Sequence, residues 1–200
     1  MAQRDITWYR RRMARWDPGA EERLKRAALE LCLERGYDNV TVTHIAERAG
    51  LTRRSYFRYF PDKREVLFAG SERLPPALAE AVLTANPDAA PLAAALDALA
   101  RVGAQLVEQV DGAAERRAVI DASPELQERE RTKTAAITEA IRDALKRRQV
   151  NAGTAELVAQ LATVAFQNAF RHWIEAKGHA SFGRCLDAAT DELRAALAGT

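Results

Sequence analysis

The chain has 200 residues, of which 48% are hydrophobic and 29% are charged, and its formal net charge is +2. These values are ordinary for a globular chain of one or two domains with a real core. No apolar run approaches the roughly 18 residues of a membrane span, and no hydrophobic region follows the N-terminal arginines, so we expect neither a membrane protein nor a secreted one. Cys32 and Cys185 imply no disulfide framework, which favours a reducing, cytoplasmic location.

The first 16 residues form a basic arm, because they hold five arginines and one aspartate together with three aromatic residues. Arg10, Arg11 and Arg12 are suited to entering a minor groove or following phosphates, as basic arms do on other DNA-binding domains. A disordered tail with nonspecific charge attraction explains the same composition equally well. Both interpretations stay open.

A first helix is predicted to begin at Asp17 and Pro18, which are an N-cap and a first-turn proline. Two glutamates in its first turn complement the positive end of the helix dipole. The helix should run to about Arg35 and end at Gly36.

Residues 40–63 are the most informative stretch, because they form two short helical patterns joined by a turn of about three residues. Thr41 can cap the first helix through its hydroxyl, and Gly50 supplies the left-handed backbone that ends it. Thr52 is then a ready N-cap for the second helix. The apolar stripe of the first helix follows the spacing i, i+3, i+4 and i+7 in Val42, Ile45, Ala46 and Ala49.

The second helix carries three arginines and no carboxylate within residues 52–60. Tyr56 and Phe60 lie i, i+4 apart and should point inward, which leaves the arginines on the outer surface. These are Arg53, Arg54 and Arg58. On charge alone, a solvated helix face is the ordinary explanation of such a cluster. The turn signals before it favour a helix-turn-helix that binds duplex DNA.

The segment from about Glu22 to Leu67 resembles the DNA-binding domain of the tetracycline-repressor (TetR) family of bacterial regulators. The matching positions are Ala27-Ala28, Leu31, Gly36-Tyr37, Thr41-Val42, Ile45-Ala46, Ala49-Gly50, Phe60 and Lys63. The rest of the chain agrees with the family in length and helical character. The resemblance implies an all-α fold of about nine helices, in which a three-helix helix-turn-helix domain precedes a helical regulatory and dimerisation domain.

The resemblance also implies a role for each matching residue. It puts Arg53 and Arg54 at the base-reading end of the recognition helix, with Thr43 beside them, and an arginine fork can bond guanine O6 and N7 together. Other matching positions hold backbone phosphates, which fix register and not sequence. The residues expected to contact DNA are Thr41, Thr43, Thr52, Arg53, Arg54, Ser55, Phe57, Arg58, Tyr59 and Lys63.

Two positions depart from the family pattern. Arg54 stands where many members carry glycine or another small residue, which adds a candidate base contact. Phe57 replaces a tyrosine whose hydroxyl commonly reaches a phosphate, which removes a hydrogen bond.

A fourth helix is predicted from Asp62, whose carboxylate can cap while Glu65 reaches back, to about Leu74. Pro75-Pro76 should interrupt it and mark the domain boundary. The expected domains are the arm at 1–16, the DNA-binding domain at 17–74 and a ligand-binding and dimerisation domain at 75–200. Residues 1–74 carry a formal charge of +5 and residues 75–200 carry −3, as expected if the first part meets DNA.

Six further helices and no strand are predicted beyond this boundary. They lie at about 77–85, 91–109, 112–121, 124–149, 154–177 and 181–198. Turn signals such as Ser123-Pro124 and Asn151-Ala152-Gly153 separate them.

The last two predicted helices favour a homodimer, because their apolar residues recur at alternating spacings of three and four. Such seams most often pack inside their own chain. However, a two-fold dimer doubles the DNA site, and in the resembling family these two helices form a four-helix interface with their symmetry mates. The predicted interface residues are Leu157, Leu161, Val164, Phe182, Leu186, Ala189 and Leu193.

The regulatory body offers a candidate pocket for a largely apolar effector, with polar groups to orient it. Its residues are Gln105, Leu106, Phe166, Asn168, Phe170, His172 and Trp173. Core or interface packing explains most of them equally well. No histidine has a partner at metal-ligand spacing, so we expect neither a metal nor another cofactor.

These patterns predict a regulator, most simply a repressor, which binds a palindromic operator as a homodimer and is released by a small molecule. The competing classes are an all-α enzyme and a helical protein-interaction domain. The sequence contains no Gly-rich, Gly-x-Ser-x-Gly or His-Glu-x-x-His motif that would favour an enzyme.

Overall fold

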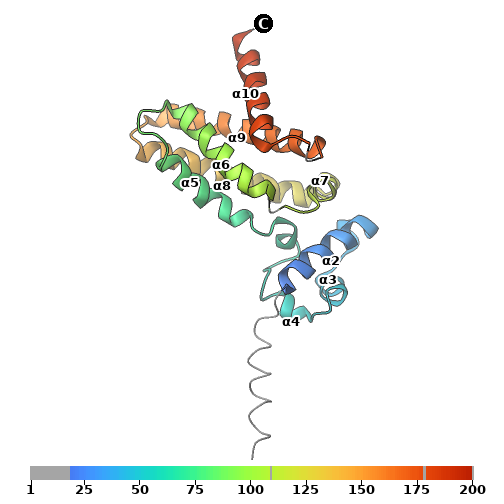
Figure 1. Cartoon of the computed structure of the whole chain (residues 1–200). Helices are drawn as coiled ribbons and strands as arrows, with labels where there is room; N and C mark the ends of the chain where they lie inside the picture. Colours follow the sequence, from blue (N-terminus) through green and yellow to red (C-terminus); the bar gives the residue numbers. More distant parts are fainter. Residues whose placement is uncertain (1–18, 109, 178, 200) are drawn as a thin grey trace, which may run out of the picture. The chain divides into compact units, whose positions relative to one another are not determined.

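The computed structural model describes residues 19–108, 110–177 and 179–199, and these residues form nine α-helices and no strand (Figure 1). The predicted all-α fold is confirmed. The predicted basic arm and the cap at Asp17 and Pro18 lie outside the described residues. Two compact units follow each other along the chain, with their boundary between Ala69 and Gly70. None of the helices in this described part has both the length and the apolar character that crossing a membrane requires.

The first unit contains three α-helices, which Figure 1 draws in blue and cyan. They are α2 (Ala20–Arg35), α3 (Val42–Arg48) and α4 (Arg53–Tyr56), and the 3-10 turns η1 (Tyr37–Asn39) and η2 (Glu65–Phe68) accompany them. α2 ends where the sequence predicts, because Gly36 adopts a φ of 76° and its N–H donates to the carbonyl of Cys32 at 2.9 Å.

The continuous helix predicted for residues 62–74 is wrong. Asp62 does act as a cap, since its Oδ1 accepts from the backbone N–H of Arg64 at 2.8 Å and of Glu65 at 3.1 Å. The turn that it starts is the short 3-10 segment η2, and Gly70 then takes a left-handed φ of 85°. A left-handed residue ends helical geometry, so no α-helix crosses this position.

The prolines at 75 and 76 do not interrupt a helix, contrary to the prediction. After the 3-10 turn η3 (Ser71–Arg73), helix α5 (Leu74–Leu83) begins, and both prolines lie in its first turn. Proline is tolerated there because first-turn N–H groups have no partner within the helix.

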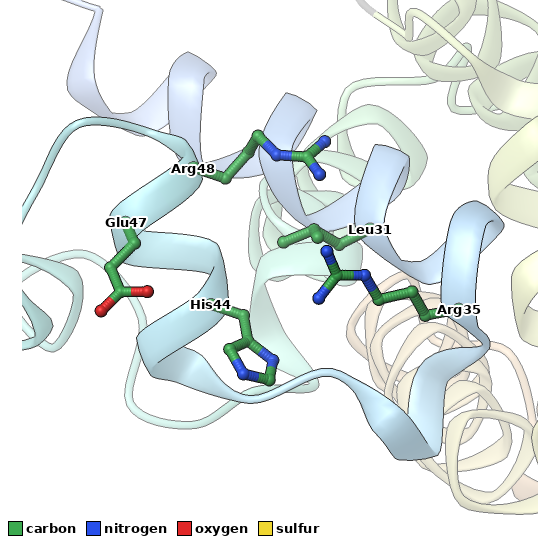
Figure 2. A pocket seen from close by; sticks show the side chains of 5 residues that line it. All are labelled: Leu31, Arg35, His44, Glu47 and Arg48. Carbon is green, nitrogen blue, oxygen red and sulfur yellow. The ribbon is translucent and has the colours of Figure 1, made fainter.

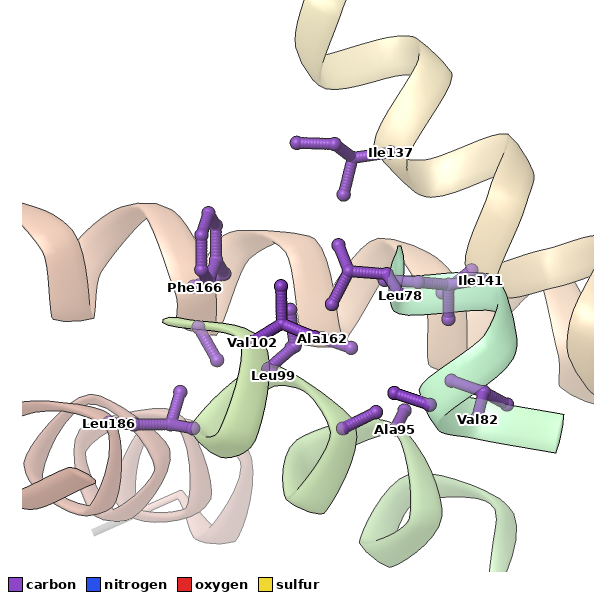
Figure 3. Close-up of a cluster of buried hydrophobic side chains, with 14 of the residues drawn as sticks. Leu78, Val82, Ala95, Leu99, Val102, Ile137, Ile141, Ala162, Phe166 and Leu186 are labelled. Carbon is purple, nitrogen blue, oxygen red and sulfur yellow. The ribbon is translucent and has the colours of Figure 1, made fainter. Parts of the chain in front are cut away.

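The second unit is a bundle of six helices, and five of them contribute to its core. The remaining elements are α6 (Pro91–Glu108), α7 (Ala113–Asp121), α8 (Pro124–Arg147), α9 (Ala152–Glu175) and α10 (Phe182–Ala198). α5 packs on α8, α8 packs on α9, and α6 contacts both α9 and α10. Figure 3 shows the side chains of the core converging, among them Leu78, Val82, Leu99, Val102, Ile137, Ile141, Phe166 and Leu186.

Side-chain caps set the starts of the last three long helices. Ser123 accepts from the N–H of Leu126 at 3.4 Å, and Asn151 accepts from the N–H of Thr154 at 2.9 Å. Ser181 caps α10 in the same way. Ala152 and Gly153, which the sequence assigns to a loop, are therefore the first residues of α9.

Three of the four residues predicted for the dimer seam on α10 are buried within their own chain. Phe182, Leu186 and Ala189 are only 2%, 3% and 4% exposed, because they belong to the core of their own chain. Side chains that are buried within one chain have little surface left with which to contact a second copy. On α9, by contrast, Leu157 is 62% exposed and Val164 is 45% exposed. Leu161 and Leu193 are half-buried.

Candidate nucleic-acid interface

Helix α3 begins at a reciprocal pair of hydrogen bonds between Thr41 and His44. Thr41 Oγ1 accepts from the N–H of His44 at 3.2 Å, and His44 Nδ1 accepts from the N–H of Thr41 at 3.3 Å. The predicted Thr41 cap is confirmed. Glutamate or glutamine usually makes the second bond of such a capping box. Sequence reasoning missed the part of His44, and the signal was its place three residues after the capping threonine.

The turn between α3 and α4 closes by two backbone hydrogen bonds around Gly50. The N–H of Gly50 donates to Glu47 at 3.0 Å, and the N–H of Leu51 donates to Ala46 at 2.8 Å. This is the Schellman arrangement, which needs a left-handed residue, and Gly50 has a φ of 69°. The turn therefore fixes the direction in which the chain enters α4 at Thr52.

Helix α4 is shorter than the predicted span of residues 52–59. Thr52 caps it as predicted, since its Oγ1 accepts from the N–H of Ser55 at 3.1 Å. Regular helix ends at Tyr56, and the chain then tightens, because the N–H of Tyr59 donates to Tyr56 only three residues back, at 2.9 Å. Residues 57–59 continue as turn.

Tyr56 anchors this segment from inside. Its ring is fully buried, and its hydroxyl donates to the carbonyl of Asp62 at 3.0 Å. Burial and the nearby Asp62 raise the pKa of this hydroxyl well above its ordinary value, so it remains a neutral donor. The Phe60 ring lies 5.6 Å away and is also buried, as the i, i+4 pattern predicts.

The outer face of the same segment is cationic and partly aromatic. Arg53, Arg54 and Arg58 are exposed, as predicted, and Phe57 is 46% exposed. The guanidinium carbon of Arg53 lies 5.6 Å from the centre of the Phe57 ring, and that of Arg58 lies 5.8 Å from the ring of Tyr59. The geometry thus offers several forked donors on one exposed segment, which suits phosphates and guanine edges.

Ion pairs and one hydrogen bond hold the helix-turn-helix on α2. Arg48 of α3 donates to both carboxylate oxygens of Glu34 at 2.9 and 2.8 Å, and lies 3.5 Å from Glu30. The hydrogen bond from Arg48 lowers the pKa of the Glu34 carboxyl. Arg23 Nε also donates to the carbonyl of Ala49 at 3.2 Å, which ties the first turns of α2 to the turn before α4.

The residues expected to hold phosphates differ in how free they are. Thr41 is exposed, as is Thr43 of the expected base-reading group, while Ser55 and Tyr59 are half-buried, and Ser55 Oγ lies 3.0 Å from Thr52 Oγ1. Lys63 is engaged within the unit. Its Nζ donates to the carbonyl of Tyr37 at 3.1 Å and lies 3.7 Å from the centre of the Tyr37 ring.

Each unit has a concave region on its surface. Figure 2 shows the first, a cavity of about 210 Å³ beside the capping residue His44, which side chains of both charges line: Leu31, Arg35, His44, Glu47 and Arg48. The second has about 550 Å³ and lies between α6 and α10. It is lined by Leu96, Asp97, Ala100, Leu186, Asp187, Thr190, Asp191 and Arg194.

Neither region contains the residues predicted to bind an effector. Phe166 is buried in the core, with its ring 5.6 Å from that of Phe182. The Phe170 and Trp173 rings lie 5.6 Å apart and are half-buried, and His172 Nε2 is 3.9 Å from Glu192. Leu106 and Asn168 are half-buried and Gln105 is exposed.

Residues 24–69 match the sequence model described as "Bacterial regulatory proteins, tetR family". No curated protein sequence matches the chain. A solved complex of SmeT with triclosan is 17% identical, with a TM-score of 0.57 over 88% of this chain and 91% of that one.

Two further structures are similar over most of their length. NalD of Pseudomonas aeruginosa, described as the secondary repressor of the MexAB-OprM multidrug efflux pump, is 18% identical, with a TM-score of 0.56 over 86% of this chain and 95% of that one. FadR of Bacillus halodurans, described as a fatty acid degradation regulator, is 14% identical, with a TM-score of 0.52 over 87% and 94%. At such identities the likeness shows a shared fold.

Proposed function

We propose that this chain, whose residues 24–69 match the tetR family, is a transcriptional regulator of that family, and that it is a repressor which a small molecule releases from a palindromic operator. The observation that carries the proposal is the surface of α4 and the turn after it. Three exposed arginines stand there on a segment that a capped turn orients and a buried tyrosine anchors.

Reading of bases is assigned to Arg53 and Arg54, with Thr43 beside them. A guanidinium fork matches guanine O6 and N7 in the major groove. The surrounding residues then hold phosphates and set the register: Thr41, Thr52, Ser55, Arg58 and Tyr59. Lys63 reaches a phosphate only by leaving the carbonyl of Tyr37, so we expect it to contribute less than its charge suggests.

A homodimer supplies the second reading head. Because Phe182, Leu186 and Ala189 of α10 are buried, we propose that the contact between subunits lies on the outer face of α9. Its apolar residues there are at i, i+4 and i+7: Leu157, Leu161 and Val164. A two-fold axis through this face matches a palindromic operator, since each half-site meets the same surface.

Release of the operator requires an effector that favours one conformation of the body, in which the spacing of the two recognition segments no longer matches that of the half-sites. A difference of a few kcal/mol between the two states is enough to move the population off the operator. SmeT is described as a complex with triclosan, which supports a largely apolar effector here. The half-buried rings of Phe170 and Trp173, with Asn168 or His172 as the polar group, are the residues proposed to meet it.

The test begins with selection of operator fragments from genomic DNA by the purified protein. Arg53→Ala and Arg54→Ala should each weaken operator binding by about 1–3 kcal/mol and relax the preference at one base position per half-site. Arg26→Ala, which removes an exposed charge from α2, is the matched control and should leave base preference unchanged. Equal loss of specific and nonspecific binding in the Arg53 and Arg54 variants would argue against base reading.

A further inference from the structure

Phe57 is an apolar side chain on a surface that also carries the exposed side chains of Arg53, Arg54 and Arg58. Its ring is 46% exposed, although it follows directly on the buried Tyr56. An exposed phenylalanine gains nothing from water, and it has no hydroxyl with which to bond a phosphate. Its contribution to binding, if it meets DNA, must come from apolar contact.

Two neighbours fix the ring of Phe57. Its centre lies 5.6 Å from that of Tyr56, with the planes at 83°, which is the edge-to-face arrangement that aromatic pairs prefer. Tyr56 is itself held by its bond to Asp62, so the ring of Phe57 rests on a rigid base. The guanidinium of Arg53 lies over the same ring, with its central carbon 5.6 Å from the ring centre.

The pair therefore presents a forked donor and an apolar surface side by side, four residues apart on one face. In the major groove the guanine edge offers two acceptors, and the one apolar group on any base edge is the C5-methyl of thymine. We propose that Phe57 contacts the methyl group of a thymine adjoining the guanine that Arg53 binds, so that the two side chains together read a two-base step. This inference rests on the proposed DNA-binding function.

The test replaces that methyl group without changing base pairing. After operator selection, each thymine of the half-site is exchanged in turn for deoxyuridine, and binding is measured for the native protein and for Phe57→Ala. At one thymine, next to the guanine that Arg53→Ala ceases to prefer, the exchange should lower the affinity of the native protein about fourfold per half-site. This is the effect of burying one methyl-sized group. Phe57→Ala should bind the thymine operator and the deoxyuridine operator with equal affinity. This affinity should not exceed that of the native protein for the deoxyuridine operator.

The controls separate this inference from its premise. A thymine outside the half-site should tolerate deoxyuridine, and Phe57→Leu should keep part of the methyl preference. Circular dichroism and thermal unfolding establish that the variants are folded, as expected for an exposed position. A selected operator with no thymine beside that guanine, or a deoxyuridine penalty that persists in Phe57→Ala, overturns the inference alone. Failure to select any sequence overturns the proposed function and this inference together.

Discussion

Gly103 of α6 lies directly against the ring of Phe182 of α10. A Cβ placed on Gly103 would overlap this ring and would lie 2.7 Å from its Cζ atom. The ring of Phe166 of α9 is 5.6 Å from the other ring, so three helices meet at this point. Glycine inside a helix costs about 1 kcal/mol relative to alanine. Here the missing side chain is what lets α10 approach α6.

Gly103→Ala should consequently lower the free energy of unfolding by about 1–3 kcal/mol, although alanine is the better helix former. Denaturant unfolding measures the change. Gly183→Ala is the matched control, since a Cβ there meets no atom within 4 Å, and it should leave stability unchanged or raise it by up to about 1 kcal/mol. A stable Gly103→Ala variant would mean that Phe182 can move aside without loss.

Arg148 joins the C-terminal end of α8 to the end of α5. Its guanidinium donates to the carbonyls of Val82 at 3.1 Å, Ala85 at 2.9 Å and Asn86 at 2.7 Å. Val82 lies in the last turn of α5, where carbonyls lack the N–H of a following helical turn, and Ala85 and Asn86 come just after the helix.

Arg148→Met keeps the apolar stem but removes the donors, so we expect a loss of about 1–3 kcal/mol in the free energy of unfolding. Arg147→Met alters the neighbouring residue, which is exposed, and should change stability by less than about 0.5 kcal/mol. Thermal and denaturant unfolding of the two variants decides the matter. Equal effects would show that only the net charge counts.

The helix-turn-helix could be predicted from the sequence because its signals are local. Thr41 and Thr52 cap through hydroxyls that reach an N–H three residues away, and Gly50 ends α3 by its own backbone freedom. Such choices depend on adjacent residues and hardly on the rest of the fold.

The structure of residues 62–76, which follow the helix-turn-helix, could not be predicted from the sequence, because their two prolines are compatible with two different structures. Pro75 and Pro76 suit either the end of one helix or the first turn of the next. Gly70 determines which of the two structures forms, because its left-handed conformation ends helical geometry before the prolines. Glycine is compatible with helix and with turn, so its conformation is not evident from sequence.

The seam on α10 shows a different limit. A spacing of three and four residues indicates that a helix face is buried, and it does not say what covers that face. Phe182 is covered by α6 of its own chain, through a glycine that lies far away in sequence. On α9 the same pattern includes Leu157 and Val164, which remain exposed.

The stability of the protein should fall at alkaline pH because of Cys32. Its side chain is 4% exposed, and burial raises the pKa of the thiol from 9.0 to about 11, with a smaller opposing effect of Lys63. The folded state keeps this proton where the unfolded state has lost it. The contribution is therefore complete below pH 9.0 and is lost as the pH rises towards about 11.

We expect Cys32 to account for a loss of about 1 kcal/mol by about pH 10. Denaturant unfolding from pH 8 to 10 should show a smaller decline in Cys32→Ala than in the native protein. Cys185 and Tyr56 also have raised pKa values, because both are desolvated by burial, so some decline should persist in this variant. Identical slopes for the two proteins would mean that the thiol ionises without cost.

The outer face of α9 should decide the oligomeric state. Leu157→Glu places a charge on a side chain that is 62% exposed in the isolated chain, so folding should survive while an apolar contact with a second copy is lost. Leu186→Glu places the same charge at a position 3% exposed, inside the core, and should unfold the body instead. Sedimentation velocity and circular dichroism separate these outcomes.

Leu33→Glu serves as the control, because Leu33 is 50% exposed on α2 and gains the same charge away from α9. It should remain a folded dimer. Leu157→Glu should sediment as a folded monomer that binds an operator weakly, since each half-site is then bound without the help of the other. A dimer that persists in Leu157→Glu and in Val164→Glu would place the contact on another face. A folded, monomeric Leu186→Glu would instead restore α10 as the interface and show that its burial within one chain is not what holds it there.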